Sequence, residues 1–310
     1  MLAFEKELEI LVNKIKDLEE FSAQHNIDLQ TEINALKNKE QEIRRKIYSD
    51  LTPYERVQLA RVSERPNTMD YINNIFTDFI ELHGDRSYRD DLSIVGGLAR
   101  FEGIPVTVIG HRKGRGTKEN LKYNFGSPYP EGYRKALRLM KQAEKFGRPI
   151  ITFIDTAGAY CGIGAEERGQ GEAIARNLME MIDLQTPIVS VLIGEGGSGG
   201  ALALAIADRF IMLENAIFSV ISVEGCASIL FKDSSRAGEA AAALKLTADD
   251  LLGFSLVDEV ISEPSGGAHH DPKLTMQRVK DALIKHLEQL QVLPKAELLE
   301  HRFNKYRSIS

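Results

Sequence analysis

Five of the seven residues from Gly194 to Gly200 are glycines, and this run follows a strand-length apolar stretch, Pro187–Ile193. Glycine lets the backbone approach a ligand closely and adopt positive φ. A small-residue helix is predicted from Ala201, and a helix N-terminus presents free N–H groups and the positive end of its dipole. The combination predicts a site for an oxyanion or a phosphate group. Glycines that only permit tight packing of helix on strand are the alternative interpretation.

The residues around this run argue against two common phosphate-binding motifs. No Lys-Ser or Lys-Thr pair follows the glycines, so the P-loop signature is missing. No acidic residue stands where a dinucleotide-binding GxGxxG unit requires one. Ser198 also lacks the spacing of a nucleophile elbow. The run therefore indicates binding by backbone N–H groups.

A second glycine-containing segment, Asp155–Gln170, leaves another apolar run, Pro149–Ile154, and enters a helix predicted at 166–182. Ligands of parallel α/β sheets bind beyond the carboxyl ends of the strands. We therefore expect the two glycine segments to lie at that edge. A plain strand-to-helix turn, with Asp155 as a local cap, is the alternative.

Neither segment contains a convincing pair of nucleophile and base. Cys161 could be reactive at a helix N-terminus, but a small buried filler is the favoured interpretation. His83 and His111 have no partner that the sequence reveals, so a structural or surface role is favoured for both. The sequence therefore points to chemistry done by oriented N–H groups.

A basic segment follows the predicted strand Ile104–Ile109, and three interpretations of it stay open. It could be a solvated run of charge, an attractor for anionic substrate groups, or a nucleic-acid contact. Glycines between the charges would let the segment drape over a ligand, which favours the second interpretation. The charged residues are His111, Arg112, Lys113, Arg115 and Lys118.

The elements around these segments predict an α/β fold with parallel strands, because buried strands alternate with helices. Ser93–Phe101 and Ile104–Ile109 flank Glu102-Gly103, which is typical of a hairpin. A helix is expected to begin at Pro130 and to end at Gly147. Further strands are expected at 149–154, 187–193, 209–213, 217–223 and 256–261, and further helices at 166–182, 236–245, 247–253 and 272–290.

Residues 1–50 differ from the rest, because they are rich in Glu and Lys and contain no glycine or proline. Two helical seams, divided by a turn at His25-Asn26, predict a helical hairpin. The hairpin could pack on its own domain or grip another subunit, since a seam alone does not say what covers it. We expect residues 1–50 to form this arm and residues 51–310 to form the main domain. The seams are Phe4, Leu8, Leu11, Ile15 and Leu18, then Leu29, Ile33, Leu36, Ile43 and Ile47.

The composition excludes several classes of protein. The chain has 310 residues, of which 43% are hydrophobic, enough to bury a full core. A net charge of -6 argues against a protein built mainly to hold nucleic acid. Two cysteines form neither a disulfide framework nor a zinc cluster, so we expect no metal in this chain. An acidic N-terminus and the absence of a bilayer-length apolar stretch predict a cytoplasmic protein.

Six sequence runs closely resemble the carboxyltransferase alpha-subunit family of bacterial acetyl-CoA carboxylase, and the likeness extends over nearly the whole chain. The resemblance implies a crotonase-like spiral of ββα units and an alpha2-beta2 heterotetramer with a carboxyltransferase beta subunit, which would carry the zinc. The runs are HGDRSYRDD (83–91), GHRKGRGTKE (110–119), PEGYRKALRLM (130–140), ITFIDTAGAYCGIGAEERGQGEAIARNL (151–178), IGEGGSGGALALAIAD (193–208) and FSVISVEGCASILFKD (218–233).

The resemblance also implies the reaction, which serves fatty acid biosynthesis. Carboxybiotin, made by biotin carboxylase and tethered to the biotin carboxyl carrier protein, would enter between the two subunits and release CO2. The amides of Gly199 and Gly200 would hold the charge left on the ureido oxygen. The biotin nitrogen would take a proton from acetyl-CoA, whose enolate would attack CO2 to give malonyl-CoA.

By the same resemblance, further residues are expected to line the biotin site, and three positions depart from the family pattern. Ala157, Cys161 and Val223 stand where the family has proline, which puts the rigidity of the segment in doubt rather than its activity. Arg112, Lys113 and Arg115 are possible anion contacts. The expected lining residues are Gly158, Ala159, Tyr160, Gly162, Gly196, Gly197 and Ser198.

Two rival functions stay open from the sequence. Another crotonase-like enzyme, a hydratase or an isomerase, would need an acidic side chain at the site, for which Glu166 or Glu195 could serve. An RNA-binding regulatory protein would use the basic segment at 111–118.

Overall fold

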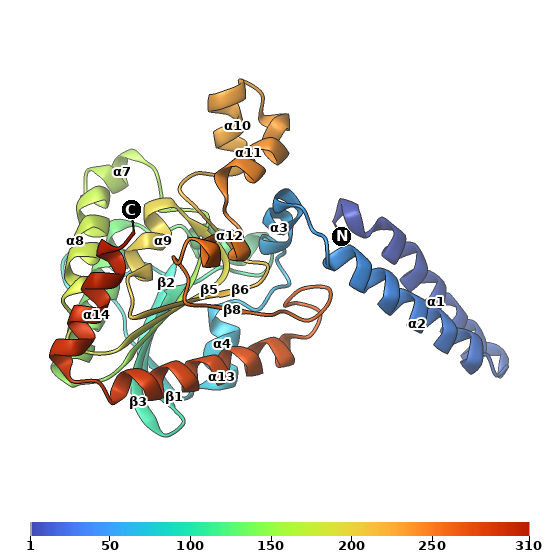
Figure 1. Cartoon of the computed structure of the whole chain (residues 1–310), viewed down its shortest axis with the longest axis horizontal. Helices are drawn as coiled ribbons and strands as arrows, with labels where there is room; N and C mark the ends of the chain where they lie inside the picture. The colour runs from blue at the N-terminus through green and yellow to red at the C-terminus, as the bar shows by residue number, and fades with distance from the viewer. Residues whose placement is uncertain (1, 310) are drawn as a thin grey trace.

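The computed structural model describes residues 2–309, and its centre is a single sheet (Figure 1). The strand order is β1-β2-β3-β4-β5-β6-β8, with β7 beside the end of β5. The pairs from β3 to β8 are parallel, whereas β1, β2 and β3 are antiparallel neighbours. The bounds are β1 Thr77–Glu81, β2 Ile94–Phe101, β3 Ile104–His111, β4 Ile150–Thr156, β5 Ile188–Gly197, β6 Arg209–Leu213, β7 Ile217–Ser219 and β8 Glu259–Ile261.

Local chemistry explains the strands that the sequence predicted. The apolar runs of β4 and β5 are buried almost throughout, as expected for parallel strands that are covered on both faces. Glu102 and Gly103 both have positive φ, 48° and 79°, which a two-residue hairpin between β2 and β3 requires. The predicted hairpin and the predicted α/β class with parallel strands are confirmed.

Helices cover the sheet on both sides, and two helical pairs, α10–α11 and α1–α2, project from the body (Figure 1). α6 packs on β2, β3 and α8, while α13 contacts α4 and β5. α10 and α11 pack on each other above the body of the molecule. The bounds are α3 Pro53–Ala60, α4 Thr68–Ile75, α5 Gly116–Lys122, α6 Pro130–Lys145, α7 Ile163–Glu166, α8 Gln170–Ile182, α9 Ser198–Ala205, α10 Val223–Phe231, α11 Ala237–Leu244, α12 Ala248–Gly253, α13 Pro272–Gln291 and α14 Lys295–Arg307.

The N-terminal segment forms two antiparallel helices, α1 Lys6–His25 and α2 Gln30–Tyr48. Asn26 caps α1 in the left-handed conformation, so the chain turns where the sequence predicted. Leu8, Ile15 and Ile33 are buried in the pair, which extends away from the sheet (Figure 1). A domain boundary at residue 50, and a grip of this pair on another subunit, stay predictions.

Two predicted elements are wrong. A strand was expected over 217–223, but β7 ends at Ser219 and α10 begins at Val223, because the Ser222 hydroxyl caps that helix through the N–H of Gly225 at 3.1 Å. One helix was expected over 166–182, but Gly169, at φ 80°, separates α7 from α8. Within residues 2–309, none of the helices combines the length and apolarity needed to cross a membrane.

Candidate active site

The glycine run does not form a loop as predicted, because β5 continues through Gly197. The cause is close packing against β4 and the segment after it. A Cβ at Gly194 would lie 2.5 Å from an Asp155 carboxylate oxygen, and one at Gly197 would lie 2.1 Å from the Ala157 carbonyl oxygen. A Cβ at Gly196 would meet the Phe218 ring at 2.5 Å. The packing interpretation therefore accounts for these three glycines.

α9 begins directly at the end of β5, at Ser198, rather than at Ala201. Its first N–H groups, those of Ser198, Gly199 and Gly200, have no acceptor within the helix by the geometry of an α-helix. A Cβ at Gly200 would lie 2.4 Å from the Ala159 nitrogen, whereas one at Gly199 would meet nothing nearer than Ile174 at 3.5 Å. Gly200 is therefore required for packing, and Gly199 leaves the start of the helix open.

The second glycine segment lies against the first, because Thr156 pairs with Gly196 across β4 and β5. The Thr156 hydroxyl accepts the N–H of Gly158 at 3.0 Å and donates to the Gly158 carbonyl at 2.9 Å. Gly158 has φ 148°, which disfavours any other residue there. The Gly158–Ala159 backbone thus reaches the first turn of α9, as the contact with Gly200 requires.

Tyr160 and Gly162 lie further along this segment. The Tyr160 ring packs on Tyr129, with ring centroids 4.5 Å apart, and its N–H donates to the Pro128 carbonyl at 3.0 Å. A Cβ at Gly162 would lie 2.6 Å from the Tyr160 ring. These two residues therefore fix the path of the segment rather than the first turn of α9.

Asp155 is the centre of a chain of charges that the sequence did not reveal. Its carboxylate accepts from the Lys113 ammonium at 2.6 Å and from the Glu195 N–H at 3.0 Å. The Glu195 carboxylate accepts from Arg61 at 2.9 Å, and Arg61 also donates to Glu224 at 2.7 Å. A cavity of about 220 Å³ lies beside these side chains. No local sequence pattern could have revealed these partners of Glu195. Arg61 is distant from Glu195 in sequence, and Glu224 lies on α10.

The basic segment is only partly solvated. His111 is fully buried, and Lys113 is paired with Asp155, so a solvated charge run is the wrong interpretation for these two residues. The Arg112 guanidinium lies over the Tyr123 ring at 4.3 Å and 3.6 Å from Glu81. Arg115 and Lys118 are exposed, and Arg115 pairs with Asp70 at 2.8 Å.

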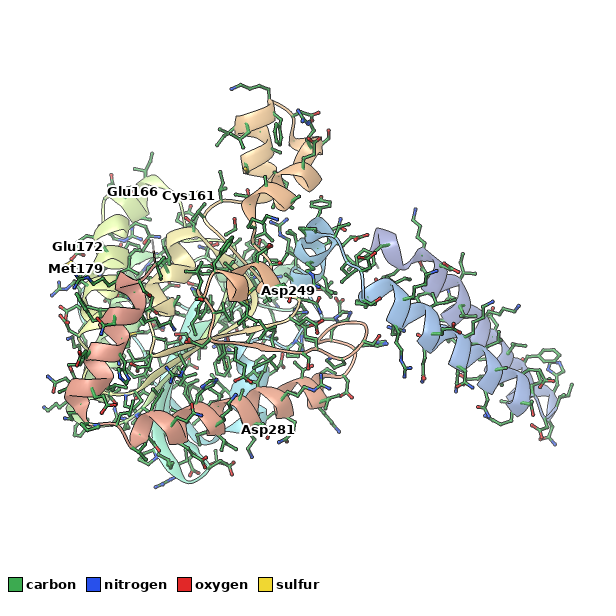
Figure 2. All side chains as sticks on the ribbon, viewed as in Figure 1. Cys161, Glu166, Glu172, Met179, Asp249 and Asp281 are labelled. Atoms are coloured by element: carbon green, nitrogen blue, oxygen red, sulfur yellow. The ribbon has the colours of Figure 1, made fainter. Side chains whose placement is uncertain are left out.

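The candidate acids and the cysteine do not assemble into a nucleophile with its base. Cys161 is exposed, so its interpretation as a buried filler is wrong. It lies at the surface just before α7, and Glu166, the last residue of α7, is also exposed (Figure 2). The Glu195 carboxylate pairs with Arg61 and lies 3.9 Å from the Lys113 ammonium. In the part of the chain that the structure describes, no three His, Cys, Asp or Glu residues are grouped so that they could hold a metal ion.

Burial lowers the pKa of His111 from 6.5 to about 4, although the Asp155 charge acts to raise it. The folded chain therefore resists protonation of His111. The contribution of this residue to the free energy of unfolding is complete above pH 6.5 and is lost as the pH falls toward 4. We expect this loss to reach about 3 kcal/mol for His111, at 1.36 kcal/mol per pKa unit.

The measurement is urea unfolding between pH 7.5 and 4.5. The free energy of unfolding of the His111→Gln variant should fall less steeply than that of the wild type, whereas His25→Gln, an exposed control on α1, should not change the slope. Equal slopes for the wild type and His111→Gln would contradict the assignment.

Comparison with known proteins identifies the family. Residues 1–310 match the family described as "Acetyl co-enzyme A carboxylase carboxyltransferase-like". A Heliobacterium modesticaldum protein named acetyl-coenzyme A carboxylase carboxyl transferase subunit alpha is 58% identical over 99% of this chain and 92% of its own length. The Bacillus subtilis protein of the same name is 54% identical, over 99% of this chain and 95% of its own.

Solved structures agree on the fold. The transcarboxylase 12S core matches 72% of this chain and 42% of its own, with a TM-score of 0.58 and 20% identity. A Pseudomonas malonate decarboxylase hetero-tetramer matches 70% of this chain and 87% of its own, with a TM-score of 0.56 and 18% identity. Together with the sequence relatives, they confirm the predicted crotonase-like fold, and the chain belongs to the acetyl-CoA carboxylase carboxyltransferase alpha-subunit family.

Proposed function

We propose that this chain supplies the biotin side of a carboxyltransferase active site, and that the first turn of α9 holds the charge on the biotin ureido oxygen. The observation that carries the proposal is the open start of α9. The N–H groups of Gly199 and Gly200 lack acceptors within the helix, and the nearest side chain to a Gly199 Cβ would be Ile174 at 3.5 Å. Gly199 is partly exposed and Gly200 is buried, so an acceptor would approach this pair of donors from the Gly199 side.

The donors of the site suit a ureido group in chemistry. Carboxybiotin, delivered by a carrier protein, supplies the carboxyl group and leaves negative charge on its ureido group. Backbone N–H donors at a helix N-terminus suit that charge because they are fixed in place before it develops. Gly158 and Ala159 form the wall beside Gly200. We include Tyr160, Gly162, Gly196, Gly197 and Ser198 in the proposed biotin site because they flank these residues in the chain.

Within the described residues 2–309, neither candidate acid is free at the first turn of α9 to take a proton from acetyl-CoA. Glu195 is paired with Arg61, and Glu166 is exposed at the end of α7. We therefore assign enolate stabilisation largely to a carboxyltransferase beta subunit, which would also carry the zinc. The hydratase or isomerase alternative lacks support for the same reason.

The test is reconstitution with the beta subunit. We expect the purified chain alone to give no malonyl-CoA from carboxybiotin and acetyl-CoA, and the mixture to give it as an alpha2-beta2 assembly. Robust malonyl-CoA formation by this chain alone would contradict the division of the site between two subunits. Co-purification without transfer would contradict the proposed reaction.

The exposed part of the basic segment should attract anionic substrate groups. We expect Arg115→Gln with Lys118→Gln to raise the KM for acetyl-CoA or carboxybiotin about twofold to fivefold, since exposed charges contribute up to about 1 kcal/mol each. The increase should be larger at low salt than at high salt, because salt screens exposed charge.

The control is Arg100→Gln, which removes an exposed arginine that also pairs with an aspartate, Asp78 at 3.4 Å. It should leave both KM values unchanged. If the variant with both substitutions behaves like this control across salt, the segment does not contact substrate. Weakened RNA binding with normal kinetics would instead favour nucleic-acid contact.

A further inference from the structure

His111 occupies an unusual place for a histidine at the end of a strand. It is the last residue of β3, its side chain is fully buried, and it lies between β4 and α9. Its backbone carbonyl accepts from the Thr68 hydroxyl at 2.5 Å, which ties the residue to α4. The reaction described above assigns it no role.

The partners of the ring determine its tautomer. Nδ1 lies 3.4 Å from the N–H of Asp155, which can only donate, and Nε2 lies 3.2 Å from the carbonyl oxygen of Gly200, which can only accept. Nδ1 is therefore the acceptor, and Nε2 carries the proton. The pKa of about 4, lowered by burial, keeps the ring neutral at physiological pH, so this arrangement persists.

A second buried donor meets the same carbonyl. The Tyr133 hydroxyl donates to the Gly200 oxygen at 3.3 Å, and Tyr133 is fully buried on α6. Two side chains from different elements thus converge on one peptide group in the first turn of α9. A turn that only needed to be helical would not require them, because the helix supplies its own hydrogen bonds beyond its first residues.

We propose that His111 is a positioning residue, which holds the first turn of α9 so that the Gly199 and Gly200 N–H groups face the biotin ureido oxygen. This inference rests on the proposed function. Its physical reason is that an oxyanion donor is effective only within a few tenths of an ångström of its hydrogen-bonding position. His111 joins that turn to Asp155, the centre of the charge chain at the end of β4.

The test is a set of three His111 variants in the assembled alpha-beta complex. His111→Gln places an amide N–H near the Nε2 position, His111→Asn places its amide near Nδ1, and His111→Leu keeps neither. We expect His111→Leu and His111→Asn to lower kcat for carboxyl transfer about tenfold to a hundredfold, with the KM for acetyl-CoA unchanged. His111→Gln should restore most of kcat.

His286→Gln is the matched control, because it alters another buried histidine, which bonds to Glu259 at 2.8 Å far from α9 in the chain. It should lower Tm without lowering kcat. If His111→Gln and His111→Asn lose kcat equally, or if kcat falls only in proportion to Tm, His111 acts on stability alone and the proposal is wrong. If His111→Leu does not fold, the comparison of the Gln and Asn variants still decides.

Gly199→Val, assayed in parallel, separates this inference from the proposed function. Loss of transfer in Gly199→Val, with normal kcat in all the His111 variants, would overturn the positioning role alone. Normal transfer in Gly199→Val would overturn the assignment of the α9 turn itself.

Discussion

Gly199→Val should lower the rate of carboxyl transfer by a factor of about a hundred to a thousand, as much as the loss of one oxyanion donor, because its side chain blocks access to N–H groups that remain in place. The fold should tolerate the change, because a Cβ at this position meets Ile174 only at 3.5 Å. The added side chain would stand at the open start of α9 and keep the ureido oxygen away from the N–H groups. The measurement is kcat for malonyl-CoA formation in the assembled complex, with Tm recorded beside it.

Gly171→Val is the matched control, because Gly171 is likewise the second residue of a helix, α8, and a Cβ there meets nothing within 4 Å. It should keep normal transfer. Gly200→Ala should differ from both, since its Cβ would lie 2.4 Å from the Ala159 nitrogen and would displace that backbone. We expect it to lose transfer and some stability together. Near wild-type turnover in folded Gly199→Val would remove the α9 turn from the mechanism.

Arg65→Met should lower the free energy of unfolding by about 3–5 kcal/mol, the usual cost of removing one partner from a buried ion pair. Arg65 and Glu263 are both buried and share two hydrogen bonds, of 2.8 and 2.7 Å. Burial by itself would raise the pKa of Glu263, but the Arg65 charge keeps that pKa below its usual value. Without Arg65, the Glu263 carboxylate would be left buried and uncompensated. Denaturant unfolding of the chain measures the loss.

Two variants make this prediction specific. Arg65→Met with Glu263→Met should be much less destabilised than Arg65→Met alone, because no charge is then left buried. Arg236→Ala breaks an exposed pair with Glu239 on α11 and should leave the free energy of unfolding almost unchanged, because solvent screens that pair. If Arg65→Met lowers the free energy of unfolding no more than Arg236→Ala does, the pair does not hold the connection between α3 and α4 to β5 and to the segment after β8.

The elements with strong local patterns followed from the sequence. β4 and β5 are apolar runs, the β2–β3 hairpin has its turn residues at Glu102-Gly103, and α6 begins at a proline. In each case the information lies within a few residues, in periodicity, turn chemistry or capping. The family resemblance then supplied the reaction, which no spacing of side chains in this chain could have given.

The tertiary structure decided what depends on contacts between distant segments. Gly194, Gly196 and Gly197 lie in a strand where Asp155, Phe218 and Ala157 are too close to leave room for a side chain. Local sequence patterns give no information about these distant neighbours. His111 was expected to be structural or at the surface; its burial and its bond to Gly200 join residues 89 positions apart.

The same holds for the charges around the site. The pairing of Lys113 with Asp155, and of Arg61 with Glu195, neutralises groups that looked free in the sequence. A sequence shows which charges and donors a chain has. The fold decides which of them stay unpaired and can meet a substrate. Buried polar groups must find partners within the protein, because an unpaired buried group is costly in free energy.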